Sequence, residues 1–101
     1  MCSFPDVNGT YACDNPELLQ EALRGKWGFK GWVMSDRRAI HDTVGAVKAG
    51  TGVELDWAPQ YYTEEKIKDA LKSGKITEED IDNLLRPRYI KMFEYGHMDV
   101  P

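Results

Sequence analysis

The sequence predicts an α/β fold in which parallel strands alternate with helices. A short apolar stretch at residues 32–34 follows Gly31 and leads directly to the carboxylate of Asp36, as buried strands of this class do. Along residues 1–57, apolar residues recur alternately at strand and at helix spacing, with short loops between the segments. This order favours parallel pairing with right-handed crossovers, and it is typical of a (β/α) barrel or an open α/β sheet.

The first strand is expected at residues 1–4, before a turn at the Asn-Gly pair of residues 8–9, which readily supplies positive φ values. A strand that begins at residue 1 suggests that the chain was cut from something longer. A helix is expected next. Residues 14–15 can cap it, Pro16 suits its first position, and Gly25 can end it.

Beyond Asp36 the sequence predicts one more helix and one more strand. The helix covers about residues 42–49 and closes at Gly50, and the strand covers residues 52–57. With the strand before Asp36, these segments complete the order strand, helix, strand, helix, strand.

The last third of the chain predicts two helices. Thr63 caps the first, which stops near residues 73–74, and Thr77 starts the second with acidic residues in its first turn. Pro87 falls where the second helix should continue, and its ring removes a backbone N–H. We therefore expect a kink or break near residues 85–86.

The composition limits the classes of function. The chain has 101 residues, of which 42% are hydrophobic and 30% charged, and its net charge is −4. These values are typical of one small globular domain or of a piece of a larger one, and they exclude a collagenous or disordered chain. The acidic balance argues against nucleic acid as a partner. No apolar run approaches the ~20 residues that span a bilayer, so no membrane partner is expected, and the compartment stays open.

Neither a metal nor a cofactor is predicted. Cys2 and Cys13 are too few for a disulfide framework, and no Cys-x-x-Cys or clustered His/Cys spacing suggests zinc. His41 and His97 lie far apart in the sequence, and we interpret each as structural or solvated rather than as a metal ligand.

Several blocks of sequence resemble one enzyme family when they are taken in order. They are Cys-Ser-Phe-x-x-Val-Asn-Gly at residues 2–9, Leu-Arg-Gly-Lys-Trp-Gly-Phe-Lys-Gly at 23–31, Val-Met-Ser-Asp at 33–36, Ala-Ile-His-Asp-Thr at 39–43 and Gly-x-Met-Asp at 96–99. Together they resemble glycoside hydrolase family 3, the β-glucosidase-like enzymes, over nearly the whole chain.

The resemblance implies a fold and an activity. The chain would be the C-terminal portion of the family's (β/α) barrel domain, with about three parallel strands. Residues 1–60 would form β/α units, and residues 61–101 would be the helices that close the barrel. The implied activity is hydrolysis of a terminal β-glycosidic bond, so the expected partner is a carbohydrate or glycoside substrate.

The resemblance also assigns residues to roles. Asp36 matches the family's nucleophile, which attacks the anomeric carbon and forms a covalent glycosyl-enzyme. Phe4 and Arg37 are the expected substrate-binding residues. Phe4 stands where the family commonly has Tyr, and Arg37 where it commonly has a Trp that lines the aglycone side. These two differences imply a substrate other than the usual glucoside, for example a deoxygenated or bulky one. The family's acid/base is expected outside this chain.

Other interpretations of the same carboxylates stay open. Asp36 could instead cap the next helix or pair with Arg37 or Arg38. Glu54 and Asp56 alternate on the following strand, and we interpret them as structural or hydrogen-bonding residues. For the whole chain, the alternative is a non-catalytic α/β module or a relict that associates without doing chemistry.

A piece with three strands cannot close a barrel, which leaves sheet edges and apolar faces exposed. We therefore expect the isolated chain to be inactive and able to self-associate. Cysteines similarly placed occur in secreted relatives, which suggests that Cys2 and Cys13 come within bonding range under oxidising conditions. The alternative is two buried free thiols.

Overall fold

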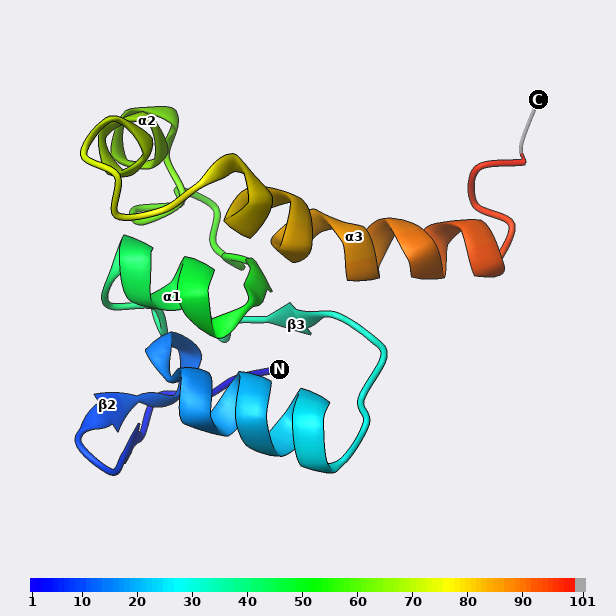
Figure 1. Cartoon of the computed structure of the whole chain (residues 1–101), viewed down its shortest axis with the longest axis horizontal. Helices are drawn as coiled ribbons and strands as arrows, with labels where there is room; N and C mark the ends of the chain where they lie inside the picture. Colours follow the sequence, from blue (N-terminus) through cyan, green and yellow to red (C-terminus); the bar gives the residue numbers. More distant parts are fainter. Residues whose placement is uncertain (100–101) are drawn as a thin grey trace.

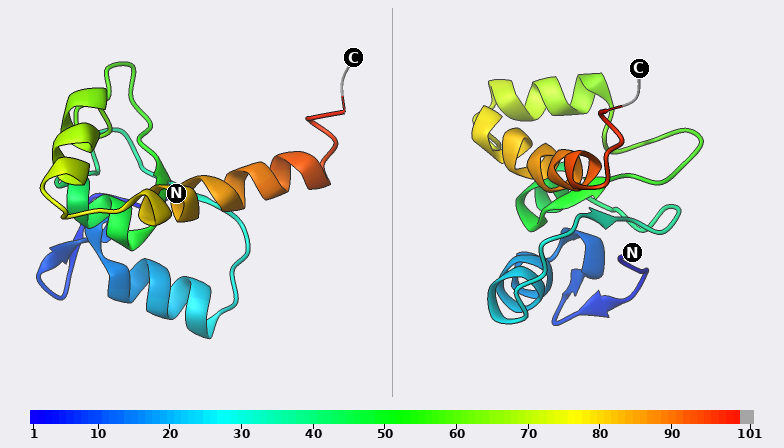
Figure 2. Two further views of the ribbon diagram at one scale, coloured as in Figure 1. Left: turned by 45° about the horizontal axis from the view of Figure 1, so that its top comes forward. Right: turned by 90° about the vertical axis from the view of Figure 1, so that its right-hand side faces the viewer.

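The computed structural model describes residues 1–99, so residues 100 and 101 of the expected closing segment lie outside the described residues. A short parallel sheet lies in the middle of the molecule between helices (Figure 1). The helix that follows the N-terminal hairpin lies on one side of the sheet, and the two C-terminal helices lie on the other, as Figure 2 shows from two further directions. The described part is therefore a small mixed α/β unit, which confirms the predicted class.

The N-terminal segment forms a hairpin rather than the expected strand at residues 1–4. Strands β1 (Asp6–Val7) and β2 (Thr10–Tyr11) pair antiparallel. The turn has positive φ values of 53° at Asn8 and 86° at Gly9, as this pair favours. Pro5 has no backbone N–H and cannot donate a hydrogen bond to a neighbouring strand. The turn instead pairs the residues that follow Pro5 with each other. Ahead of the hairpin, only Cys2 joins the parallel sheet, through a single bridge to Ser35.

The predicted parallel pairing is present in the centre of the chain. Strand β3 (Val33–Met34) pairs in parallel with β4 (Thr51–Val53), with Val33 opposite Thr51. Residues 1–99 contain two two-stranded sheets, so the expected arrangement of three parallel barrel strands is not confirmed.

Two short helices complete the first half. The 3₁₀ helix η1 (Ala12–Asp14) follows the hairpin, and η2 (Glu17–Lys26) is a helix of the wide π type. The backbone N–H of Trp27 donates to the carbonyl of Ala22, five residues earlier, at 3.0 Å. Asn15 caps the start of η2, because its Oδ1 accepts from the N–H of Leu18 at 3.2 Å.

Helix α1 (Thr43–Ala49) begins and ends where the sequence predicts. The side chain of Asp42 accepts a hydrogen bond from the N–H of Gly45 at 2.7 Å, and Gly50 ends the helix with φ 89°. Its faces contribute to two apolar clusters, Ala46 and Ala49 to the one around η2 and β3, and Val47 to the one under the C-terminal helices. Helix α1 is therefore the central packing element.

Helices α2 (Glu64–Lys72) and α3 (Glu78–Glu94) start at the predicted caps, Thr63 and Thr77. Of the kink or break predicted near residues 85–86, the break is wrong, because α3 continues through Pro87 to Glu94. The proline removes one N–H donor, while on its N-terminal side Leu84 is buried and packs with the second apolar cluster. The C-terminal half of α3 extends away from the rest of the molecule (Figure 1). No helix within residues 1–99 is long and apolar enough to cross a membrane.

A disulfide joins Cys2 and Cys13, whose Cα atoms are 5.4 Å apart, which confirms that the two residues come within bonding range. It closes a loop with a sequence separation of 11. A cross-link of this span contributes about 3 kcal/mol to stability in the chain-entropy model. Because Cys2 also pairs with Ser35, the disulfide links the hairpin region to the end of β3.

Candidate functional site

Asp36 follows the carboxyl end of β3 and its backbone is held on both sides. Its N–H donates to the carbonyl of Cys2 at 2.8 Å, and its own carbonyl accepts from the N–H of Ala39 at 3.1 Å. The side chain is half-buried, and its Oδ1 accepts a hydrogen bond from the N–H of Arg37 at 2.7 Å. A carboxylate at the carboxyl end of a parallel strand, with a fixed backbone, has the rigidity that a nucleophile requires.

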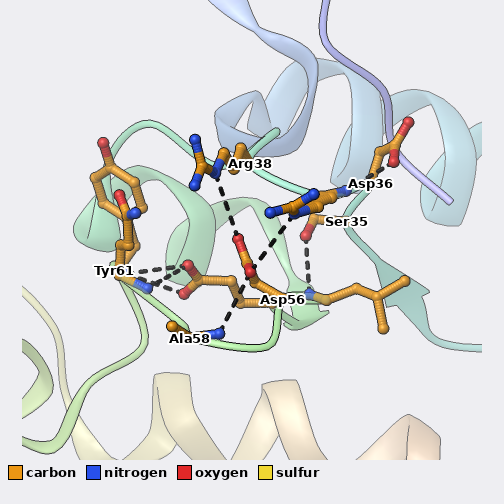
Figure 3. Close-up of polar contacts among 10 residues, drawn as sticks. Ser35, Asp36, Arg38, Asp56, Ala58 and Tyr61 are labelled. Atoms are coloured by element: carbon orange, nitrogen blue, oxygen red, sulfur yellow. Dashed lines mark hydrogen bonds and ion pairs between the residues drawn. The ribbon is translucent and has the colours of Figure 1, made fainter.

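Ser35, directly before Asp36, ties β3 to the segment after β4. Its side chain is fully buried, and its Oγ accepts from the N–H of Leu55 at 3.1 Å. Its own N–H donates to the carbonyl of Val53 at 2.9 Å. The position of Asp36 is therefore linked through Ser35 to the chain around Leu55 (Figure 3).

Both arginines after Asp36 form their ion pairs with a different carboxylate. Nε of Arg37 lies 3.8 Å from Oδ1 of Asp56, and Nε of Arg38 lies 3.9 Å from Oδ2. The side chain of Asp56 is only 6% exposed and also accepts from the N–H of Ala58 at 3.3 Å. Within residues 1–99, Asp36 therefore forms no ion pair with Arg37 or Arg38, so that alternative is wrong.

Glu54 is occupied by the loop that follows β4. Its carboxylate accepts hydrogen bonds from the backbone N–H groups of Gln60 (2.7 Å), Tyr61 (3.0 and 3.1 Å) and Tyr62 (2.6 Å), some of which appear in Figure 3. Three backbone donors on one carboxylate hold this loop closed. The interpretation of Glu54 and Asp56 as hydrogen-bonding residues agrees with these contacts.

Trp57 is an exposed aromatic residue at this end of the sheet, and the sequence alone gave it no role beyond the end of a strand. The guanidinium carbon of Arg37 lies 4.4 Å from the centre of its ring. The Trp57 side chain is 87% exposed. A hollow of about 280 Å³ is lined by Arg37, Leu55, Asp56 and Trp57. The sequence signal that could have pointed to Trp57 is the alternation of acidic and apolar residues in Glu-Leu-Asp-Trp, beyond the strand.

Phe4 comes two residues after Cys2, which joins the parallel sheet through its bridge to Ser35. Cys2 runs parallel to Ser35, so the chain two residues beyond Cys2 extends in the direction of Asp36 and Arg37. The Phe4 side chain is 50% exposed, which leaves its ring available for contact with another molecule.

Asp14 is a second buried carboxylate that sequence reasoning treated only as a helix cap. Its Oδ2 accepts from the N–H of His41 at 3.1 Å, whereas Oδ1 has no hydrogen-bond partner within residues 1–99. Burial raises the pKa of Asp14 to about 6, the hydrogen bond from His41 opposes the rise, and the charge of Asp42 adds to it. The pKa of Tyr62 is also raised, mainly by burial and to a smaller extent by the charges of Asp14 and Glu54.

Replacing Asp14 by Asn should stabilise the chain at neutral pH. The pKa of the folded state lies above the usual 3.8, so ionised Asp14 costs stability above pH 6, and this cost disappears as the pH falls from 6 towards 4. Relative to the unsubstituted chain, the free energy of unfolding of the Asn variant should be higher by roughly 1–2 kcal/mol at pH 7.5 and unchanged at pH 4. The value at pH 7.5 is reduced to allow for solvent screening of the charge. Urea denaturation across this range measures the gain.

Asp82→Asn, at an exposed position on α3, is the matched control for Asp14→Asn and should change the free energy of unfolding little at pH 7.5. A gain in Asp14→Asn that is equal at pH 4 and pH 7.5 would contradict the assignment of a raised pKa to Asp14.

Within the described residues, no group of three or more His, Cys, Asp or Glu side chains is placed to hold a metal ion. The arrangement instead offers a half-buried carboxylate beside an arginine–tryptophan pair. In chemical terms it can supply a fixed nucleophile or anion next to a binding surface.

Comparison with known proteins gives the family. The model of the glycosyl hydrolase family 3 N-terminal domain matches residues 1–87. The chain is 39% identical over 84 residues to an exo-α-(1→6)-L-arabinopyranosidase of Bifidobacterium breve and 38% identical over 86 residues to β-glucosidase B of Emericella nidulans. These matches cover 83% and 85% of this chain and 11% and 10% of the relatives. The chain thus spans about a tenth of the length of these relatives.

A solved structure gives the same result for the fold. β-Glucosidase 3B from Thermotoga neapolitana, in complex with glucose, superposes with a TM-score of 0.73 at 40% identity, covering 84% of this chain and 13% of that protein. The matched model describes the family's N-terminal domain. The sequence predicted a narrower position for the chain, in the C-terminal portion of the barrel, and the match does not show that position. This chain belongs to glycosyl hydrolase family 3, in the family's N-terminal domain.

Proposed function

We propose that this chain carries the catalytic nucleophile of a retaining β-glycosidase, and that the nucleophile is Asp36. The observation that supports this most is the place of Asp36 directly beyond β3, with its N–H bonded to Cys2 and its carboxylate outside the ion pairs that Arg37 and Arg38 make with Asp56. The longer protein would be a glycoside hydrolase like its relatives.

The proposed reaction has two displacements. A carboxylate oxygen of Asp36 bonds to the anomeric carbon, the bond to the leaving oxygen breaks, and that oxygen takes a proton from a general acid outside this chain. A water molecule then attacks the same carbon and gives its proton to the same group, now a base. The Asp36 carboxylate is released, and two inversions give net retention at the anomeric carbon.

The family's barrel gives a frame for the short strands. We propose that the Cys2 segment, β3 and β4 are neighbouring parallel strands of a barrel that only the longer protein completes. Residues 1–60 would then form β/α units, and residues 61–101 would be helices that close them. The single Cys2–Ser35 bridge and the β3–β4 pairing support this order, because both are parallel.

Substrate contacts are proposed for Phe4 and Arg37. Arg37 directly follows Asp36, and Phe4 comes two residues after Cys2, whose bridge to Ser35 is parallel. Phe4 has an apolar ring and no hydroxyl, and Arg37 presents a cation rather than an indole. The names of the relatives suggest two sugars to test, a β-glucoside and an α-L-arabinopyranoside.

The stereochemical outcome tests the proposed reaction. The full-length protein that contains this segment should hydrolyse 4-nitrophenyl β-D-glucopyranoside or α-L-arabinopyranoside. ¹H NMR in the first minutes should show product with the anomeric configuration of the substrate. Initial release of the opposite anomer, or no turnover of either glycoside, would contradict the proposal.

A further inference from the structure

We infer that Asp14 is a positioning residue for Asp36, because it fixes the far end of the loop at residues 37–41 that follows the proposed nucleophile. The inference rests on the proposed function, since it concerns how the attacking carboxylate of that reaction is held. It goes further by giving a buried side chain outside the sheet an effect on the rate of attack at the anomeric carbon.

The loop holds both the backbone and the carboxylate of Asp36. The N–H of Arg37 donates to Oδ1 of Asp36 at 2.7 Å, and the N–H of Ala39 donates to the Asp36 carbonyl at 3.1 Å. The direction of the carboxylate therefore follows the path of the loop backbone. A shift of that path would move the oxygen that bonds to the anomeric carbon, and the rate of such a step is sensitive to displacements of about 1 Å.

The path of the loop needs support from outside the loop. Arg38 has a φ of 60°, in the left-handed region that residues with a side chain rarely adopt. A residue keeps such a conformation where the surrounding structure fixes it. Ala39 and Ile40 come next and are 0% and 1% exposed, so they anchor the loop in the core. Apolar burial has no direction, however, and it leaves the orientation of the peptide groups to hydrogen bonds.

Asp14 supplies a hydrogen bond of this kind at the end of the loop. Its Oδ2 accepts from the N–H of His41 at 3.1 Å. Asp14 is only 6% exposed, and its Oδ1 has no hydrogen-bond partner within residues 1–99, which makes the burial of this charge costly. The cap of η2 does not explain the burial, because Asn15 accepts from the first turn there. The bond to His41 gives the buried carboxylate a role that helix capping does not.

The short helix η1 also reaches Asp36 by a second route. Its Cys13 forms the disulfide with Cys2. The carbonyl of Cys2 accepts from the N–H of Asp36 at 2.8 Å. A Cβ at Gly45 would lie 3.2 Å from Cβ of Asp14, so η1 rests directly on the first turn of α1. Asp36 is therefore held on its amino side through the disulfide and on its carboxyl side through Asp14.

The test measures, in the full-length protein, the rate constant of covalent labelling by 2,4-dinitrophenyl 2-deoxy-2-fluoro-β-D-glucopyranoside. Asp14→Leu keeps the size of the side chain and removes the acceptor for the His41 N–H, so the rate constant should fall by about 10- to 100-fold. Asp14→Asn keeps an oxygen at that place and should retain most of the rate. Unfolded enzyme reduces the amount that is labelled but not the rate constant of the folded molecules, and Asp14→Ala replaces the Leu variant if that variant does not fold.

A matched control and an added nucleophile separate positioning from general damage to the site. Asp6 also accepts a backbone N–H, that of Gly9 at 2.7 Å in the exposed hairpin turn, and Asp6→Leu should keep the labelling rate. In Asp36→Ala the carboxylate is absent, so adding Asp14→Leu should not change the turnover of 2,4-dinitrophenyl β-glucoside that azide supports.

The outcomes distinguish this inference from the proposed function. Labelling of Asp36 at an unchanged rate in Asp14→Leu, or an equal loss in Asp14→Asn, would overturn the inference alone. An equal loss in the azide reaction would do the same. No labelling of Asp36 in the unsubstituted protein, by this reagent or by the corresponding α-L-arabinopyranoside, would overturn the proposed function and this inference with it.

Discussion

Replacing Asp36 by Asn in the full-length protein should reduce kcat/KM for an aryl β-glycoside by on the order of 10³–10⁶. An amide has the shape of the carboxylate but cannot bond to the anomeric carbon as an anion. The contacts that fix the site remain, because the N–H of Asp36, its carbonyl and the Oδ1 that accepts from Arg37 are all present in Asn. The thermal midpoint should therefore change little.

An added nucleophile separates a catalytic role of Asp36 from a structural one. With Asp36→Ala and a 2,4-dinitrophenyl β-glycoside, azide should restore turnover by attacking the anomeric carbon in place of the carboxylate. The product should be a glycosyl azide of inverted configuration. Asp82→Asn, exposed on α3, should keep full activity. Full activity in Asp36→Asn would show that another carboxylate is the nucleophile.

The 101-residue chain alone should be at least about 10⁴-fold less active than the full-length protein. Loss of a general acid costs roughly 10²–10⁴ by itself, and most of the sugar-binding residues are expected outside this segment. The chain spans only 10% of β-glucosidase B of Emericella nidulans and 13% of β-glucosidase 3B of Thermotoga neapolitana. Release of 2,4-dinitrophenol from its β-glucoside measures the difference. Turnover by the isolated chain that Asp36→Ala abolishes would refute this prediction.

The described structure suggests what else the isolated chain would do. Its exposed apolar side chains include Trp27, Trp57, Phe93 and Tyr95, and its two sheets have only two strands each. Light scattering coupled to size-exclusion chromatography should detect self-association, as open edges and apolar faces favour. A soluble monomer at all concentrations would count against this expectation.

Local signals explain the parts of the fold that the sequence predicted. The caps at Asp42, Thr63 and Thr77, and the left-handed Gly50, depend on residues within one turn of the helix end. The parallel pairing of β3 and β4 followed from the alternation of segments, which constrains topology.

The errors occurred where two local preferences competed. Residues 1–4 have strand character, but Pro5 and the Asn8-Gly9 turn made the neighbouring segment the more favourable hairpin. Pro87 should end a helix, yet α3 continues through it, with Leu84 buried on one side and N–H bonding intact beyond it. The continuation of α3 depends on the packing around Leu84, which the local sequence near Pro87 does not reveal.

The candidate site likewise has a part that the sequence predicts and a part that it does not. Asp36 was predictable because a carboxylate after a buried strand is a local pattern. The partner of Arg37 and Arg38 was not, because Asp56 lies in the segment after β4 and meets them only through the pairing of β3 and β4. The burial of Asp14 beside His41 likewise depends on how η1 packs against α1.

Covalent labelling identifies the carboxylate that attacks the anomeric carbon. The full-length protein is incubated with a 2-deoxy-2-fluoro β-glycoside that carries a good leaving group, which slows release of the glycosyl-enzyme, and is then digested and analysed by mass spectrometry. We expect one added fluoroglycosyl group per molecule, on the peptide that contains residues 32–37, with fragmentation placing it on Asp36. A label on Glu54, Asp56 or a carboxylate outside this chain would contradict this expectation.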